Sequence, residues 1–498
     1  MSLKQQVVKG VSWNFLDQVI RQVVSIGVTA VLARILSPND YGLVALSSIF
    51  VGFVSLFESL SIGSALIQRS DLDDRYISTS FWTSVFTGGA LAIVLCIIAP
   101  FAAGYFDKPL LINIIDISAI NLIVSPVGST HRMLLARKLE FGKLTFINII
   151  FAIIGGIASL ILALSGLGVW SLVLGGLIAS ALIIPLLWYF EEWRHGFIFD
   201  RNCFRELFSF SSYLLSSNVV FYFARNFDNL IVGKYLGANM LGIYSMAYNL
   251  MMKPLQQISW SITSVLFPAF SSIQGDLARI RSAYLKALSG IALITFPMMM
   301  GLMMVSEEFV LVMVGPKWQG VVLPLKVLCP VGALQSIGTT VGAIFNSLGR
   351  TDLQFKTGVI TSLGHVIGFI ICIRWGLMGL VKGYLVTNII FVSYSLFFTF
   401  RLIHLSTREF LQVLKMPAIN TAIMVLALMV YRRLDASFMH FSIYLNLAIS
   451  VCLGVFIYTA ATLIFTDRKQ IDELKTMVGL RMKTVDNCVE ERDIRGQS

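Results

Sequence analysis

A small number of charged side chains lie deep within stretches of this sequence that are otherwise long and apolar. A charge at the depth of a lipid bilayer is costly unless it faces water, a counter-charge or a ligand of opposite sign. Side chains kept in such positions therefore mark candidate sites for binding or transport. The cations of this kind, which we take as candidate contacts of an anionic substrate, are Arg21, Arg225, Lys253, Lys326 and Lys382.

Two of these cations have an acid close by in the sequence. Asp17 and Arg21 are four residues apart, so on a helix they lie one above the other. Arg225 and Asp228 share a helix face in the same way. Such a pair can line a hydrated path and couple an ion, or it can be a neutral pair that holds helices together. The sequence leaves both interpretations open.

The other charges in apolar stretches have no obvious counter-charge close by in the sequence. Lys253 has no acid within one helical turn, which favours contact with substrate. Lys326 and Lys382 can either contact substrate or extend their ammonium groups toward the membrane surface. Glu58 is a lone acid that suits a proton carrier and a protonated helix contact equally well.

The cysteines and histidines give no sign of a metal or redox site. The 6 cysteines and 5 histidines are scattered singly, without the paired spacing that zinc ligands or redox motifs require. Small apolar packing is the simpler role for the cysteines. We therefore predict no metal and no cofactor.

Long apolar segments must position these charges. The chain is 56% hydrophobic and 13% charged, which is more apolar surface than a soluble fold of 498 residues could bury. Apolar segments of about twenty residues recur along it and predict an all-α integral membrane protein of about 14 transmembrane helices. The expected helices lie near residues 8–36, 42–67, 77–105, 110–134, 143–164, 168–189, 206–233, 240–268, 283–314, 319–348, 355–374, 376–400, 411–431 and 442–466.

The distribution of Lys and Arg predicts the orientation of these helices. Cationic loops stay on the cytoplasmic side of a membrane. Alternate connectors, counted with the two ends of the chain, hold about 26 Lys and Arg on one side and about 7 on the other. Both termini are therefore expected in the cytoplasm of a bacterial inner-membrane protein. Much of the net charge of +11 reflects this topology, so nucleic acid is not needed as a partner.

Sliding the chain along itself by about 200 residues reveals an internal repeat. Residues 34–42 align with 234–242, with Leu, Asn and Gly in register. Residues 168–177 align with 376–385 in the same way. Each repeat contains six helices, and since six is even the two repeats enter the membrane with the same orientation.

The repeat predicts two parallel six-helix lobes with a substrate site in the cleft that they share. The lobes are expected at residues 1–200 and 201–408. Two further transmembrane helices at 409–466 and a polar cytoplasmic tail at 467–498 fall outside the repeat.

Several passages of this sequence resemble a known family, the polysaccharide transporters of the MOP (multidrug, oligosaccharidyl-lipid, polysaccharide) exporter superfamily. The resemblance is greatest to the branch that exports colanic acid and lipopolysaccharide O-units. No single passage is diagnostic, and together they extend over most of the chain. The passages lie at residues 32–42, 65–69, 135–143, 266–276 and 315–318.

This resemblance implies a MATE-like fold of two six-helix lobes around a central cavity, working by alternating access. It implies a flippase rather than an enzyme, with undecaprenyl pyrophosphate-linked oligosaccharide as substrate, for exopolysaccharide or lipopolysaccharide biosynthesis. Membrane lipid and a polysaccharide polymerase machinery are the partners it implies. The matching passages lie mostly at helix ends and in loops, so they carry over no binding residue, and the buried cations remain our own inference.

Three other functions remain to be weighed. A drug or metabolite exporter of the same superfamily would be expected to favour acids in its cavity, whereas this chain places mainly cations there. A membrane enzyme acting on the same lipid carrier would be expected to have a long external loop with acidic or metal-binding residues, and the external connectors here are short. A scaffold in a polysaccharide assembly complex is not distinguished by sequence.

Overall fold

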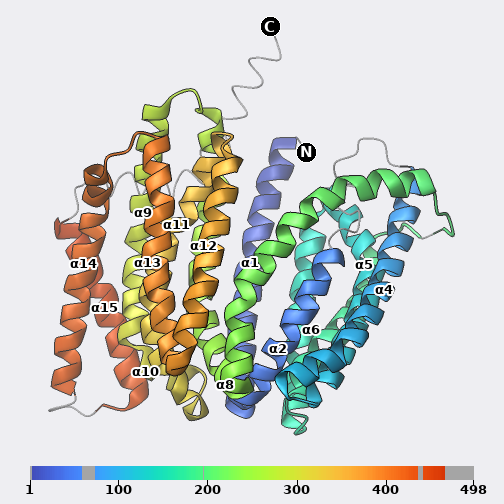
Figure 1. Cartoon of the computed structure of the whole chain (residues 1–498), viewed down its shortest axis with the longest axis horizontal. Coiled ribbons are helices and arrows are strands. Elements are labelled where there is room, and N and C mark those ends of the chain that lie inside the picture. The colour runs from blue at the N-terminus through green and yellow to red at the C-terminus, as the bar shows by residue number, and fades with distance from the viewer. Residues whose placement is uncertain (1–2, 59–72, 195, 436–440, 466–498) are drawn as a thin grey trace. The chain divides into compact units, whose positions relative to one another are not determined.

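The computed structural model describes residues 3–58, 73–194, 196–435 and 441–465. The described part is helical throughout its secondary structure, and Figure 1 shows long, roughly upright helices joined by short connectors. By length and composition, 11 stretches within the described residues are able to cross a membrane, and one of them, Thr351–Leu402, contains two helices in succession. The predicted all-α membrane fold class is confirmed.

The chain divides into two compact units, Met1–Gly242 and Ile243–Ser498. The boundary predicted near residue 200 separates the two copies of the sequence repeat, which is a different division from that into compact units. It stays a prediction. In the described residues the first unit begins with a bundle of six helices, in which neighbours in contact include α1 with α6, α4 with α5 and α6 with α7. Its helices are α1 (Leu3–Ile35), α2 (Pro38–Glu58), α4 (Asp74–Phe106), α5 (Leu110–Arg137), α6 (Phe141–Leu164) and α7 (Trp170–Phe190).

The second unit is also a helical bundle. Its helix α11 packs on both α9 and α13, and α14 packs on α9 and α15. One apolar core lies around Phe270, Tyr284 and Ile344, and a methionine-rich one around Met304 and Met424 joins α9 to α14. The helices are α9 (Leu277–Met304), α10 (Ser306–Met313), α11 (Val322–Ser347), α12 (Thr351–Cys372), α13 (Gly376–Leu402), α14 (Thr407–Leu434) and α15 (Ile443–Phe465), with 3-10 turns η1 (Pro316–Val321) and η2 (Ile373–Trp375).

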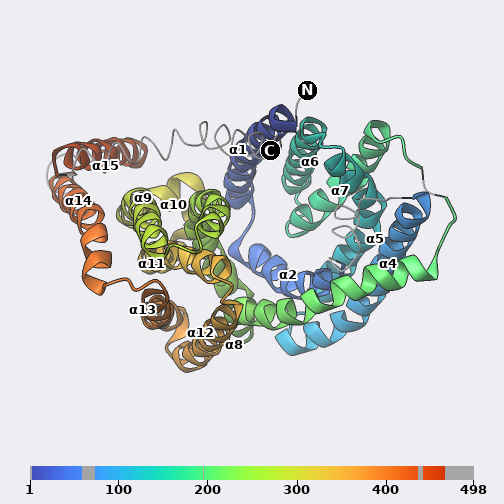
Figure 2. The ribbon, with the colours of Figure 1, turned by 90° about the horizontal axis from the view of Figure 1, so that it is seen from above.

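Element α8 (Arg201–Ser272) contains the two helices that the sequence predicts at 206–233 and 240–268. They meet at Gly237, whose φ of 82° and ψ of 172° are non-helical and break the helix between them. Glycine adopts a positive φ without a steric penalty, so one residue suffices for the bend. In Figure 1 the first part of α8 (green) lies across one end of the first bundle and then turns to run beside α2, and Figure 2 shows the same two segments side by side from above. Tyr222 holds it there, because its hydroxyl donates to the carbonyl of Ile49 at 2.8 Å.

The first copy of the repeat begins at a capped helix end. At the start of α2, Asp40 accepts from the backbone N–H of Ser37 at 2.9 Å, and the hydroxyl of Ser37 accepts from the backbone N–H of Asp40 at 3.3 Å. Pro38 occupies the first helical position, where its missing N–H has no cost. The Ser-Pro-Asn-Asp passage at residues 37–40, which lies between the helices expected at 8–36 and 42–67, is thus a helix start.

Residues 34–42 and 234–242, the aligned passages of the repeat, meet within the first unit. A Cβ built on Gly42 would lie 1.7 Å from the carbonyl oxygen of Ala238, and one built on Gly242 would lie 1.8 Å from the carbonyl oxygen of Pro38. Since Pro38 aligns with Ala238 and Gly42 with Gly242, the contact is reciprocal. The two matched glycines are required because the two backbones approach too closely for any side chain.

Candidate functional site

Helix α1 carries the charged pair that its spacing predicts. The Arg21 guanidinium donates from Nε to Asp17 Oδ1 at 2.9 Å and from its Nη2 to Asp17 Oδ2 at 2.7 Å, which is a bidentate ion pair. The Asp17 side chain is 7% exposed, whereas that of Arg21 is 46% exposed. The carboxylate is therefore enclosed by the bundle, and one edge of the guanidinium stays open.

Two further polar residues join this pair from other helices. Asn148 of α6 donates from Nδ2 to Asp17 Oδ2 at 3.3 Å. Its Oδ1 accepts from Nη1 of Arg132, on α5, at 2.7 Å. Arg132 also interacts electrostatically with both Asp17 and Arg21. Asp17, Arg21, Arg132 and Asn148 thus form one polar network, which we call the arginine cluster.

Close packing of α1 against α6 places the arginine cluster. A Cβ built on Gly156 of α6 would lie 2.6 Å from a methyl group of Val28, and Gly142 lies against the ring of Trp13. Thr145 donates its hydroxyl to the carbonyl of Trp13 at 3.2 Å. Small residues let two membrane helices approach closely, which brings Asn148 within reach of Asp17.

The arginine cluster has more positive than negative charge. Arg21 and Arg132 are both cationic, Asp17 is the one acid and is bound by Arg21 and Asn148, and Asn148 is neutral. An unbalanced cation within a membrane bundle is costly without water or an anion. Arginine donates N–H groups in a fixed fork that matches carboxylates and phosphates. The cluster can therefore bind an anion at the open edge of Arg21.

The other predicted site residues are distributed over both units. On α8, Arg225 is exposed and Asp228 is buried, with its carboxylate accepting from the backbone N–H of Asn229 at 2.8 Å. Farther along the chain, Lys253 and Lys326 are half-buried on α8 and α11, and Lys382 is exposed on α13. Glu58 is the last residue of α2, and its side chain lies outside the described residues. A single cavity shared by all five cations stays a prediction.

Sequence reasoning missed Arg132 and Asn148. Arg132 lies near the end of the apolar stretch at 110–134, where the sequence predicts a cation of the cytoplasmic connector that follows. Asn148 lies in the apolar stretch at 143–164 and is uncharged, so a search for buried charges does not find it. A polar side chain among Leu, Ile and Phe is itself the signal that could have identified Asn148, since it must find a hydrogen-bond partner inside the membrane.

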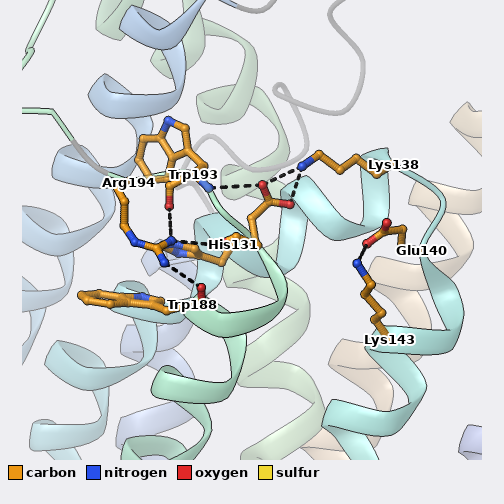
Figure 3. A network of polar contacts seen from close by, with 8 residues as sticks. His131, Lys138, Glu140, Lys143, Trp188, Trp193 and Arg194 are labelled. Atoms are coloured by element: carbon orange, nitrogen blue, oxygen red, sulfur yellow. Dashed lines mark hydrogen bonds and ion pairs between the residues drawn. The ribbon is translucent and has the colours of Figure 1, made fainter.

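A second polar network, shown in Figure 3, fixes the chain where it leaves α7. Lys138 Nζ lies 2.6 Å from the buried carboxylate of Glu191. Arg194 donates to the carbonyl oxygens of Trp188, Glu191 and Trp193 at 2.8–3.0 Å, which satisfies acceptors at the end of the helix. His131 lies against Trp188 and bonds the Trp193 carbonyl through Nε2. This network also holds two cations and one acid, but Lys138 and Arg194 are both exposed, and Arg194 is held by backbone carbonyl oxygens rather than by an acid. Its contacts therefore serve to fix the end of the helix.

Metal binding has no support in the described part of the chain, where no three His, Cys, Asp or Glu side chains come together as ligands. The arrangement offers hydrogen-bond donors and positive charge, which serve recognition of an anion.

Comparison with known proteins gives a consistent family and fold. A family model described as polysaccharide biosynthesis protein matches residues 31–323. The chain is 29% identical to the lipopolysaccharide biosynthesis protein WzxC of Escherichia coli (strain K12) over 402 residues, which are 80% of this chain and 81% of WzxC. It is 28% identical to the teichuronic acid biosynthesis protein TuaB of Bacillus subtilis (strain 168) over 465 residues, or 92% and 95% of the two chains.

A solved structure shares the fold. The lipid II flippase MurJ, in an inward closed conformation, superposes with a TM-score of 0.72 at 17% sequence identity, covering 93% of this chain and 100% of that chain. At this identity the likeness concerns the fold. It agrees with the MOP-type architecture that the sequence predicts.

Proposed function

Because the chain belongs to the polysaccharide biosynthesis protein family, as its sequence predicts, we propose that it is the flippase of a polysaccharide pathway. Its substrate is an oligosaccharide unit linked to undecaprenyl diphosphate, which it moves across the bacterial inner membrane by alternating access. The match to TuaB over 92% of the chain supports a role in making a cell-surface polysaccharide. The fold shared with MurJ supports movement of a lipid-linked precursor.

The arginine cluster is the observation that carries this proposal. A diphosphate head group is too polar to cross the hydrocarbon layer unaided, so its carrier must offer charge and hydrogen bonds inside the membrane. Arg21, paired with Asp17, and Arg132, bound to the neutral Asn148, offer both. Arg225 and Lys253 are proposed as further contacts of the anionic substrate. The polyprenyl tail needs no such path, since it can remain in lipid.

The same charge balance decides against the nearest alternative. A multidrug exporter of this fold that carries cations needs acidic groups facing its cargo. The arginine cluster would repel such cargo. A membrane enzyme on the same lipid carrier is disfavoured because the shared fold is that of a flippase.

The membrane context of the proposal follows from the cation distribution. We place both termini in the cytoplasm, where the glycolipid is presented, and release in the periplasm. A polysaccharide polymerase in the same membrane would consume the released unit. Lys138 and Arg194, which hold the α5 and α7 ends in Figure 3, belong on the cytoplasmic side in this arrangement.

Cells lacking the gene and supplied with variants test the function. Arg21→Ala, Arg225→Ala and Lys253→Ala are each expected to reach normal protein levels, to lose surface polysaccharide on gels and to accumulate lipid-linked precursor. Lys143→Ala is the control, because Lys143 is half exposed, pairs with nearby Glu140 and lies over the ring of Phe190, away from the arginine cluster's own contacts. Normal polysaccharide in all three variants would contradict the cationic substrate path.

A further inference from the structure

We propose that Arg21 and Arg132 together form the site for the diphosphate group, that Asp17 is an internal carboxylate which competes with it, and that Asn148 positions the three charges. The inference rests on the proposed function. It assigns a binding site to one chemical group of the proposed substrate, the diphosphate. Its basis is the geometry of the arginine cluster.

Asn148 is suited to its position because it is neutral. Both ends of its amide are used, since Nδ2 donates to Asp17 at 3.3 Å and Oδ1 accepts from Arg132 at 2.7 Å. An aspartate of the same shape could accept from Arg132 but could not donate to Asp17, and its charge would cancel the excess cation. A neutral amide therefore fixes the position of Arg132 without consuming its charge.

The two guanidinium groups keep donors available for a ligand. Arg21 binds Asp17 through Nε and Nη2, and Arg132 binds Asn148 through Nη1. Each guanidinium has five N–H donors. Among the residues whose side chains are described, no other hydrogen bond of either group is seen. A diphosphate has enough oxygen acceptors to bind both arginines at once.

Asp17 opposes the ligand that the arginines attract. Its carboxylate occupies two donors of Arg21 and repels any phosphate that approaches the same guanidinium. In the empty site it offsets part of the positive charge, which would otherwise be costly within the membrane. Tight binding of substrate would slow its release, so a carrier gains from a competitor built into the site.

Binding measurements on the purified full-length protein in phosphatidylcholine nanodiscs test the site. The probe is undecaprenyl diphosphate, with undecaprenol as the ligand that lacks phosphate. Arg132→Gln and Asn148→Asp are each expected to weaken diphosphate binding about tenfold or more, because each removes or cancels one charge-assisted contact. Asp17→Asn is expected to bind more tightly than the natural protein. Lys143→Gln, on the same helix as Asn148 and paired with Glu140, is expected to bind unchanged.

The outcomes separate this inference from the proposed function. Unchanged diphosphate binding in both Arg132→Gln and Asn148→Asp would overturn the site, and so would equal affinity for undecaprenol. Weaker binding by Asp17→Asn would overturn its role as competitor. The same preparations in liposomes report glycolipid translocation independently: a protein that binds as expected but translocates nothing refutes the flippase and leaves the site intact. Translocation by Asn148→Asp at the natural rate refutes the site and leaves the flippase intact.

Discussion

At the residue scale, the buried charges of this protein differ in whether an acid balances each cation. Arg432 near the end of α14 pairs with Glu308 of α10 and also bonds the Met304 carbonyl, so one cation meets one acid. Asp17 instead forms an ion pair with Arg21 and is also the acid that interacts electrostatically with Arg132, so two cations have one acid. Replacing a balanced pair by neutral groups is often tolerated, whereas removing one partner strands a charge. The two arrangements therefore respond differently to paired substitutions.

For the balanced pair we expect rescue. Glu308→Gln alone should destabilise the protein by about 3 kcal/mol, because it leaves Arg432 without its counter-charge. The double variant Glu308→Gln with Arg432→Gln should recover most of that loss. Thermal unfolding in detergent measures both, and a double variant less stable than either single one would contradict the assignment.

For the arginine cluster we expect no rescue of transport. Arg21→Gln should abolish polysaccharide export, and Asp17→Asn combined with Arg21→Gln should not restore it, because the missing cation is a substrate contact. Export is read from surface polysaccharide at matched protein levels. Restored export in the double variant would show that Asp17 and Arg21 are only a structural pair and would remove Arg21 from the site.

At the element scale, hydropathy predicted nearly all the helices because each must span about the same thickness of hydrocarbon. The exact points at which helices break were harder to predict from hydropathy. The two expected helices of α8 meet directly at Gly237 without a longer connector, and the expected helix at 283–314 is divided between α9 and α10 at Val305. The Asp17–Arg21 pair was predictable because it lies within one helix. Arg132 and Asn148 were not assigned to the site, since their contacts depend on how separate helices pack.

The reciprocal glycine contact of the repeat gives a prediction about packing. Gly42→Ala and Gly242→Ala each place a methyl group against a backbone carbonyl, which must move to accommodate it. Each should lower stability by about 1–3 kcal/mol. Gly27→Ala, where a Cβ would meet no atom within 4 Å, is the control and should be neutral or slightly stabilising. Thermal unfolding measures the stability of each variant. Equal stability of all three variants would contradict the close approach of the two backbones.

At the scale of the whole molecule, the excess of basic residues predicts the topology. Residues 37–41, 165–167 and 315–318 should face the periplasm, and 136–143 and 191–205 the cytoplasm. In a background without the natural cysteines, Asn39→Cys and Ser165→Cys should react with a membrane-impermeant maleimide in intact cells. Leu139→Cys and Glu192→Cys should react only after lysis. These four positions are exposed, so a reversed pattern at two of them would refute the topology.

The central claim is that this chain moves a diphosphate-linked glycolipid across a bilayer. Its most direct test is reconstitution of the purified protein into liposomes, with a fluorescent undecaprenyl diphosphate-linked oligosaccharide in the inner leaflet and an impermeant reagent outside. The account predicts that the natural protein makes the glycolipid accessible much faster than empty liposomes do, and that Arg21→Gln does not. Accessibility no faster than in empty liposomes, with the protein folded and correctly inserted, would contradict it.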